Sequence, residues 1–146
     1  MLGQFDDHGI RFDYPPDWDI DVEQDEARVT ISLQDPRGPA FAMIVVDSGK
    51  PAPSEMLDEA LAAMREEFPN QDARSAAEIL DGQEAIGHDI EFFSLDLIGT
   101  CELRAVQTKR HTLLVMNQWS ENVDGEEHAD LFRKLRGSLR ATDFLD

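Results

Sequence analysis

The sequence is poor in cysteine and has no long apolar run. Cys101 is the only cysteine among 146 residues, which excludes an intramolecular disulfide and fits a reducing compartment. No apolar stretch approaches the roughly 18–20 residues that a membrane-spanning helix needs. The first residues, MLGQFDDHG, carry acids where a secretory leader would carry basic residues. We therefore expect a cytoplasmic protein without a membrane span.

Positive charge is also scarce. Thirteen Lys and Arg stand against 31 Asp and Glu, which gives a formal net charge of −18 at pH 7. Phosphate-binding surfaces need clustered Lys and Arg, and the chain has such a cluster only near its end, in residues 133–140. The charge therefore disfavours nucleic acid and anionic membranes as partners. Basic proteins and cations remain as partners, and the alternative is that the charge serves only solubility.

The common catalytic signatures are missing. The sequence contains no G-x-S-x-G, H-E-x-x-H, P-loop or G-x-G-x-x-G pattern. Cys101 would form a thiolate–imidazole pair with His88 or His111 if neighbouring strands brought them together. A small, buried strand residue is the favoured interpretation of Cys101. We therefore predict that the protein is not an enzyme, with no catalytic residue and no cofactor.

Metal-binding patterns are weak as well. An EF-hand loop starting at Asp17 would need Gly at its sixth position and Glu at its twelfth, where the chain has Val and Arg. The four histidines are scattered and lack the spacing of zinc ligands, and we expect His128 on the surface. A looser cation site at Asp6 and Asp7 stays open as an alternative, and no metal site is predicted.

Residues 9–23, GIRFDYPPDWDIDVE, organise the rest of the chain. Apolar residues at every second position predict a half-buried strand before Pro15 and another after Pro16, with inward side chains Ile10, Phe12, Tyr14, Trp18, Ile20 and Val22. Neither proline can donate a backbone hydrogen bond, so the pair ends the first strand. We predict a two-stranded ribbon with one apolar face and one face of carboxylates in solvent.

The remaining chain predicts further strands and two helices. Strands are expected at 28–34, 40–46, 76–80, 83–94, 99–108 and 112–119, and those at 40–46 and 112–119 are apolar enough for the middle of a sheet. One helix is expected to begin at Ser54 and to end before Pro69, and another spans about 124–139. Residues from about 140 to 146 are expected to be a loose tail. This pattern predicts a single α+β domain over 1–146, with an antiparallel β-sheet of about six to eight strands flanked by two main helices.

Several of these residues resemble a known family. They are Gly9-Ile10, Phe12, Tyr14-Pro15 and Trp18 at the front, Asp81-Gly82 with Ala85 and Ile90-Glu91 in the middle, and Phe132, Leu135, Ser138 and Leu139 in the last helix. Together they resemble the Mog/PsbP-like family, in its bacterial DcrB-like branch. The resemblance implies an antiparallel sheet flanked by helices and carries over no catalytic residue. Related bacterial chaperone-like proteins of type VI secretion are dimers that shield hydrophobic segments of effectors, which implies a protein partner and a homodimer.

The leading functional hypothesis is a non-catalytic protein-binding module, such as a secretion-associated adaptor or chaperone. Exposed aromatic side chains anchor interfaces, and carboxylates attract basic partners. The candidate partner-binding residues are Trp18, Asn117, Trp119, Asp17, Asp19 and Asp21. The alternative is a small-ligand-binding or metal-dependent enzyme with a pocket near Trp119. A purely structural acidic protein is the third hypothesis.

Overall fold

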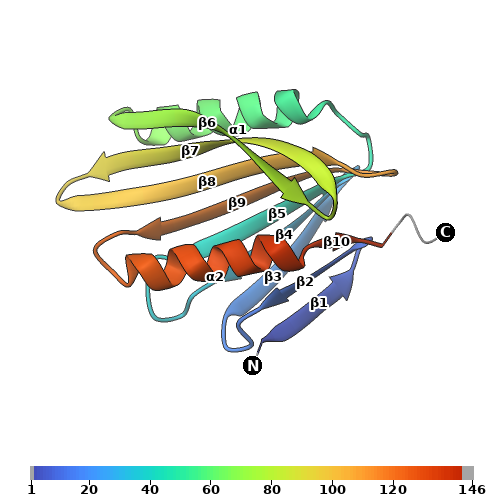
Figure 1. Cartoon of the computed structure of the whole chain (residues 1–146), viewed down its shortest axis with the longest axis horizontal. Coiled ribbons are helices and arrows are strands. Elements are labelled where there is room, and N and C mark those ends of the chain that lie inside the picture. The colour runs from blue at the N-terminus through green and yellow to red at the C-terminus, as the bar shows by residue number, and fades with distance from the viewer. Residues whose placement is uncertain (1, 143–146) are drawn as a thin grey trace.

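The computed structural model describes residues 2–142. Its strands are β1 (Gly3–Asp7), β2 (Ile10–Tyr14), β3 (Asp19–Asp25), β4 (Arg28–Gln34), β5 (Phe41–Asp47), β6 (Gln71–Leu80), β7 (Gln83–Ser94), β8 (Leu97–Gln107), β9 (Thr112–Ser120) and β10 (Arg140–Ala141). Its helices are α1 (Pro53–Glu67) and α2 (Gly125–Ser138). Seven strands form an antiparallel sheet in the order β3-β4-β5-β9-β8-β7-β6, and three form a smaller sheet in the order β1-β2-β10 (Figure 1). The predicted α+β fold is confirmed.

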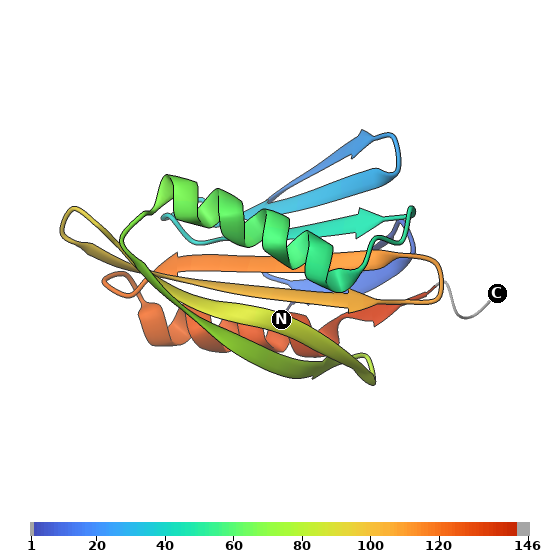
Figure 2. The same ribbon diagram turned by 90° about the horizontal axis from the view of Figure 1, so that it is seen from above.

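The large sheet has a different cover on each face. α2 and the three-stranded sheet lie on one face, and α1 lies on the other (Figures 1 and 2). α1 packs on β7, β8 and β9, whereas α2 packs on β9 and β2. The strands β3 and β4 therefore lie beyond the area that α1 covers.

The middle of the large sheet consists of the two most apolar strands. β5 and β9 are neighbours, with Met43 opposite Met116 and Ile44 opposite Val115, which confirms their predicted central position. Because successive side chains of a strand point to opposite faces, Ile44 and Val115 enter the core beneath α2, whereas Val45 enters the core beneath α1.

Phe132 of α2 lies at the centre of the larger core. Its side chain is fully buried, and its ring centroid lies 5.8 Å from that of Trp18 and 5.6 Å from that of Trp119. Such aromatic pairs contribute roughly 0.5–1.5 kcal/mol beyond the burial of their area. Trp18 is inward, as predicted, and Phe132 joins α2 both to the start of β3 and to β9.

The prediction that residues 9–23 form a two-stranded ribbon is wrong. β2 pairs with β1 and β10 in the small sheet, whereas β3 pairs with β4 in the large one. The Pro15-Pro16 segment carries the chain between sheets, with the Trp18 N–H donating to the Pro15 carbonyl at 3.1 Å. Ile20 and Val22, predicted to be inward, are 39% and 40% exposed, because β3 is an edge strand. An alternating sequence shows that a strand has two faces, but does not show which sheet the strand joins.

The helices and the C-terminal segment also depart from expectation. α1 begins with Pro53 after Ala52 as N-cap, so Ser54 does not cap it. In α2, His128 is buried and not on the surface as predicted, because its ring finds a partner in Asp35. Arg136 of the same helix is buried as well, against Glu78. Arg140 and Ala141 were assigned to a loose tail, but they form β10, and residues 143–146 of that tail lie outside the described residues.

Neither α1 nor α2 combines the length and apolar character needed to cross a membrane.

We predict that Phe132→Ala lowers the free energy of unfolding by about 3–5 kcal/mol, because it leaves a cavity between the buried rings of Trp18 and Trp119. Leu131→Ala, at a half-buried position on the same helix, should cost less than about 1.5 kcal/mol. Urea unfolding of both variants measures the difference. Equal losses would show that Phe132 is not the centre of this core.

Candidate functional site

Three of the predicted binding residues lie in the core instead of on a surface. Trp18, Asn117 and Trp119 are 5%, 0% and 4% exposed. The two indole rings pack against Phe132, and the Trp119 N–H donates to Glu121 Oε1 at 2.8 Å. The space beside Trp119, where a pocket was predicted, therefore holds the ring of Phe132.

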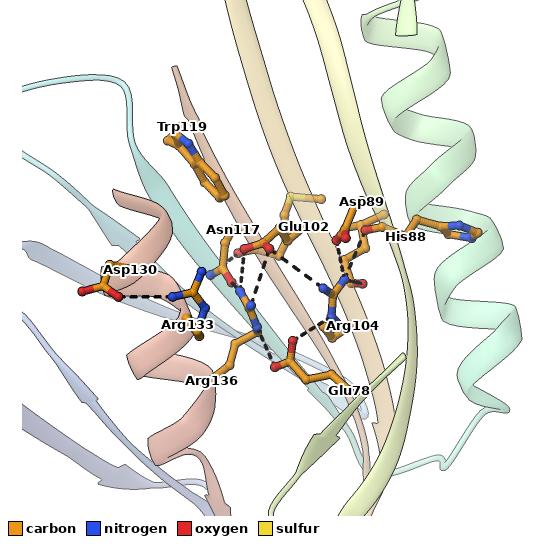
Figure 3. Close-up of polar contacts among 12 residues, drawn as sticks. Glu78, His88, Asp89, Glu102, Arg104, Asn117, Trp119, Asp130, Arg133 and Arg136 are labelled. Carbon is orange, nitrogen blue, oxygen red and sulfur yellow. Dashed lines mark hydrogen bonds and ion pairs between the residues drawn. The ribbon is translucent and has the colours of Figure 1, made fainter. Parts of the chain in front are cut away.

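Asn117 belongs to a buried ion network between α2 and the large sheet (Figure 3). Arg136 Nη1 donates to Asn117 Oδ1 at 2.9 Å and to Glu102 Oε1 at 2.6 Å, while its Nε donates to Glu78 Oε2 at 2.9 Å. Arg104 approaches the same Glu78 at 3.2 Å. Both arginine side chains are about 95% buried, with 4% and 5% exposure. The network therefore ties α2 to β6, β8 and β9.

The carboxylates of this network are committed to the arginines. Burial raises the pKa of Glu78, but the hydrogen bonds and charges of Arg136 and Arg104 together outweigh that effect and leave the pKa below its usual value. Asp89 lies 2.8 Å from Arg104 Nη1 as an ion pair. Position 87 has no room for a side chain, since a Cβ there would clash with the Leu103 carbonyl oxygen and lie 2.9 Å from Cδ of Arg104. The network therefore has a structural role, since its carboxylates are ion-paired with arginines and are not placed to act as a general acid or base.

Asp35 and His128 form a second buried polar pair. His128 Nε2 lies 3.3 Å from Asp35 Oδ2, and its Nδ1 lies 3.0 Å from the Val123 carbonyl oxygen. Burial raises the pKa of Asp35, but hydrogen bonds from the Arg37 backbone N–H, from His128 and from the Arg37 guanidinium together lower it below its usual value. A surface hollow of about 450 Å³ lies against this pair. Because both ring nitrogens of His128 have protein partners, neither faces the hollow as a general base.

Cys101 offers no nucleophile. Its side chain is fully buried beneath α1, and burial raises the pKa of the thiol to about 12. The thiolate, which is the reactive form, is thus absent at neutral pH. The predicted buried strand position of Cys101 is confirmed. Within residues 2–142, no three His, Cys, Asp or Glu side chains gather in a way that would hold a metal ion.

An apolar groove runs along the side of α1, on the face of the large sheet that this helix only partly covers. Its volume is about 360 Å³. The sheet contributes its floor and α1 contributes one wall, with Met43, Val45, Leu114 and Met116 below and Met56, Ala60 and Ala63 beside them. Methionine side chains are flexible and polarizable, so they adapt to apolar surfaces of different shape. We call this feature the methionine groove.

Arg28 and Glu59 border the methionine groove and hold α1 to the sheet. Arg28 Nε donates to Asp47 Oδ2 at 2.8 Å, and its Nη1 donates to Glu59 Oε1 at 3.2 Å. The hydrogen bonds to Glu59 and Asp47 raise the pKa of Arg28. The positive charge at this border is therefore already matched by two carboxylates.

A row of carboxylates on β3 continues the same face. Residues in register across neighbouring strands share a face, and Asp21 is followed across the sheet by Ser32, Met43 and Met116. The same register places Asp19, Glu23 and Asp25 beside Asp21, and all four are exposed. We call these four side chains the acidic row. Asp17 lies before β3 and forms an ion pair with Arg37 at 2.8 Å.

Of the predicted binding residues, Asp19 and Asp21 thus lie on the same face of the sheet as the apolar groove, separated from it by β4, and the aromatic pair does not. Sequence reasoning missed Met43, Met56 and Met116. Met43 and Met116 each lie in a nearly unbroken apolar strand, where nothing distinguishes a covered position from an open one. The number of predicted helices was the one signal that part of the sheet would stay uncovered, since two helices cannot cover both faces of so wide a sheet.

Searches of protein-family models and of curated proteins gave no match. Among solved structures, the cyanobacterial PsbP protein CyanoP from Synechocystis sp. PCC 6803 is similar, with a TM-score of 0.68 at 12% identity over 96% of this chain and 92% of that chain. The fold is PsbP-like. This confirms the fold that the sequence resemblance implied, and at this identity it shows the fold alone.

Three further structures share this fold. LpqN of Mycobacterium tuberculosis, a protein involved in cell envelope biogenesis, has a TM-score of 0.59 at 16% identity over 95% of this chain and 89% of that chain. PA94 of Pseudomonas aeruginosa, a putative regulator of unknown function, has a TM-score of 0.53 at 13% identity over 94% of both chains. A Bacteroides thetaiotaomicron protein has a TM-score of 0.61 at 12% identity over 91% of this chain, which spans 45% of that protein's length.

We predict that Arg136→Met lowers the free energy of unfolding by about 3–5 kcal/mol, because it leaves the half-buried Glu78 and Glu102 beside each other with Arg104 as their remaining cation. Arg133→Met, on the exposed side of the same helix, should change it by less than about 0.5 kcal/mol. Chemical denaturation measures both variants. A loss of similar size in both would contradict the structural role of the network.

We predict that Asp35 contributes stability that is lost in acid. Its folded pKa lies below the unfolded value of about 3.9, so the folded protein binds fewer protons and the contribution is complete above about pH 5. The contribution falls as the pH drops through the folded pKa. The difference in unfolding free energy between the wild type and Asp35→Asn should therefore be largest at pH 5–6 and smaller near pH 3. A difference that is constant over this range would refute the linkage.

Proposed function

We propose that the protein is a non-catalytic protein-binding module that holds an amphipathic, basic helix of a partner in the methionine groove. The observation that carries the proposal is that the acidic row lies on the strand next to the rim of an open apolar groove, with Glu23 opposite the groove residue Thr30. A helix that presents apolar side chains at i, i+4 and i+7 fits such a groove. Lysine and arginine on its flank would face the acidic row.

Two contributions favour this occupant. Burial of a large apolar side chain contributes roughly 1.5–3 kcal/mol, and the groove is apolar along both its floor and its α1 wall. The net charge of −18 adds long-range attraction for a basic segment, which raises the association rate and makes it sensitive to salt. An acidic or uncharged segment would lack the second contribution.

The proposed role is that of an adaptor or chaperone associated with secretion, which shields the apolar face of a segment until it is released. The flexible methionines support it, since they accept segments of differing sequence. The sequence resemblance to DcrB-like bacterial proteins and to chaperone-like proteins of type VI secretion supports the same role. The absence of a spare acid, base or thiolate at Glu78, His128 and Cys101 supports a function without catalysis.

The test compares two substitutions on α1 that change the charge equally. Ala63 lines the methionine groove, whereas Ala62 is exposed on the helix outside the groove. We predict that Ala63→Arg weakens binding of a fluorescent 18-residue peptide with a leucine face and lysine flanks by at least about tenfold relative to Ala62→Arg. Fluorescence polarisation measures the affinities.

A peptide of the same composition, scrambled to remove the apolar face, is the ligand control and should bind the wild type much more weakly. The proposal fails if the scrambled peptide binds equally well, or if the two arginine variants bind the patterned peptide alike.

A further inference from the structure

β3 is an edge strand with free backbone positions along one side. It pairs with β4 over seven residues, from Asp19 opposite Gln34 to Asp25 opposite Arg28. Between residues 2 and 142 no strand joins its other side, and Figure 2 shows β3 at the rim of the sheet, beyond β4 from α1. An edge of this kind presents unpaired N–H and C=O groups that another strand can join.

The two faces of β3 have different chemistry. One face carries the acidic row, and the other carries Ile20 and Val22, which lie in register with the buried Leu33 and Ile31 of β4. An added strand with aliphatic side chains on this second face would cover Ile20 and Val22 and extend the apolar layer by one strand. On the first face its side chains would meet three or more carboxylates.

The charge of the acidic row selects the added strand. Two copies of β3 paired with each other would place carboxylate against carboxylate, which is unfavourable. Within the described chain, Asp19, Asp21 and Glu23 form no ion pair that would neutralise them. Charged side chains protect many edges against unwanted pairing, and the carboxylates of β3 do so against a second copy. Between Asp19 and Asp25, however, β3 has no proline and pairs with β4 without a bulge, so its backbone can accept a strand of opposite charge. The edge is thus closed to a second copy and open to a strand of opposite charge.

We propose that β3 is a docking edge that an extended segment of a partner protein joins as an eighth strand. The segment alternates Lys or Arg, which face the acidic row, with Val or Ile, which cover Ile20 and Val22. This inference does not rest on the methionine groove, since it concerns the backbone edge of β3 and its Ile20–Val22 face; the two proposals share only the acidic row. A partner could use either surface alone.

The probe is a nine-residue peptide of alternating lysine and valine with blocked ends. Two further peptides carry N-methyl groups, on the lysine amides in one and on the valine amides in the other, which keeps the composition and the charge. A strand offers alternate amides to each of its two edges, so one methylated peptide should bind at least about tenfold more weakly than the other. Equal affinities of the two methylated peptides and the parent would overturn the proposal.

Two protein variants with the same change in net charge complete the test. Asp19→Asn/Asp21→Asn/Glu23→Gln should weaken binding of the parent peptide by at least tenfold, whereas Asp58→Asn/Glu66→Gln/Glu67→Gln, all exposed on α1, should bind it like the wild type. Equal losses in both triple variants would show attraction to the net charge alone and would refute a docking edge. Circular dichroism confirms that each variant is folded.

The variant Ala63→Arg separates this proposal from the proposed function. It should leave the affinity for the lysine–valine peptide unchanged and weaken the binding of the helical peptide. Weaker binding of both peptides to this variant would place the extended peptide in the methionine groove and would refute the docking edge. Slower hydrogen exchange of β3 amides upon peptide addition is the expected direct signature.

Discussion

One helix is too narrow to cover a seven-stranded sheet, and the functional surfaces of this protein depend on that constraint. Neighbouring strands lie about 4.8 Å apart, so seven strands span roughly 29 Å, whereas a helix with its side chains is about 10–12 Å wide. On one face the shortfall is met by the three-stranded sheet beside α2. On the other face α1 lies alone over β7–β9 and part of β5, where Val45 is buried, and the sheet beyond it toward β3 stays open. The methionine groove and the acidic row both lie on this open area.

The covered face is held by two kinds of contact that depend on each other. Phe132 fills the space between Trp18 and Trp119, while Arg136 on the same helix reaches Glu78 and Glu102. Burial of the Arg136 charge would destabilise the fold without those carboxylates. The two carboxylates would likewise repel each other if α2 and its Arg136 were displaced. α2 therefore has one well-determined position. The half of the molecule that α2 covers thus supports the open half, where Met43 and Met116 lie.

The sequence predicted the positions of most strands and both helices. It did not predict which strands pair or which distant side chains meet. Alternation in residues 10–22 located two strands and the inward Trp18, but the assignment of β2 and β3 to different sheets depends on partners elsewhere in the chain. Likewise, Arg136 and His128 have charged or polar side chains typical of a helix surface, and their burial depends on Glu78 and Asp35, which are 58 and 93 residues away. The acidic side chains of Asp19 and Asp21 were placed in solvent correctly, because four carboxylates on one strand face cannot be buried together.

The most direct test of the account is the accessibility of the methionine methyl groups in solution. Met43 and Met116 line the open groove, whereas Met64 is 3% exposed beneath α1. With ¹³C-labelled methionine methyls, a soluble paramagnetic agent should broaden the signals of Met43 and Met116 and leave that of Met64 sharp. Addition of the amphipathic basic peptide should then restore the first two signals. Equal protection of all three methyls without peptide would contradict an open face beside α1.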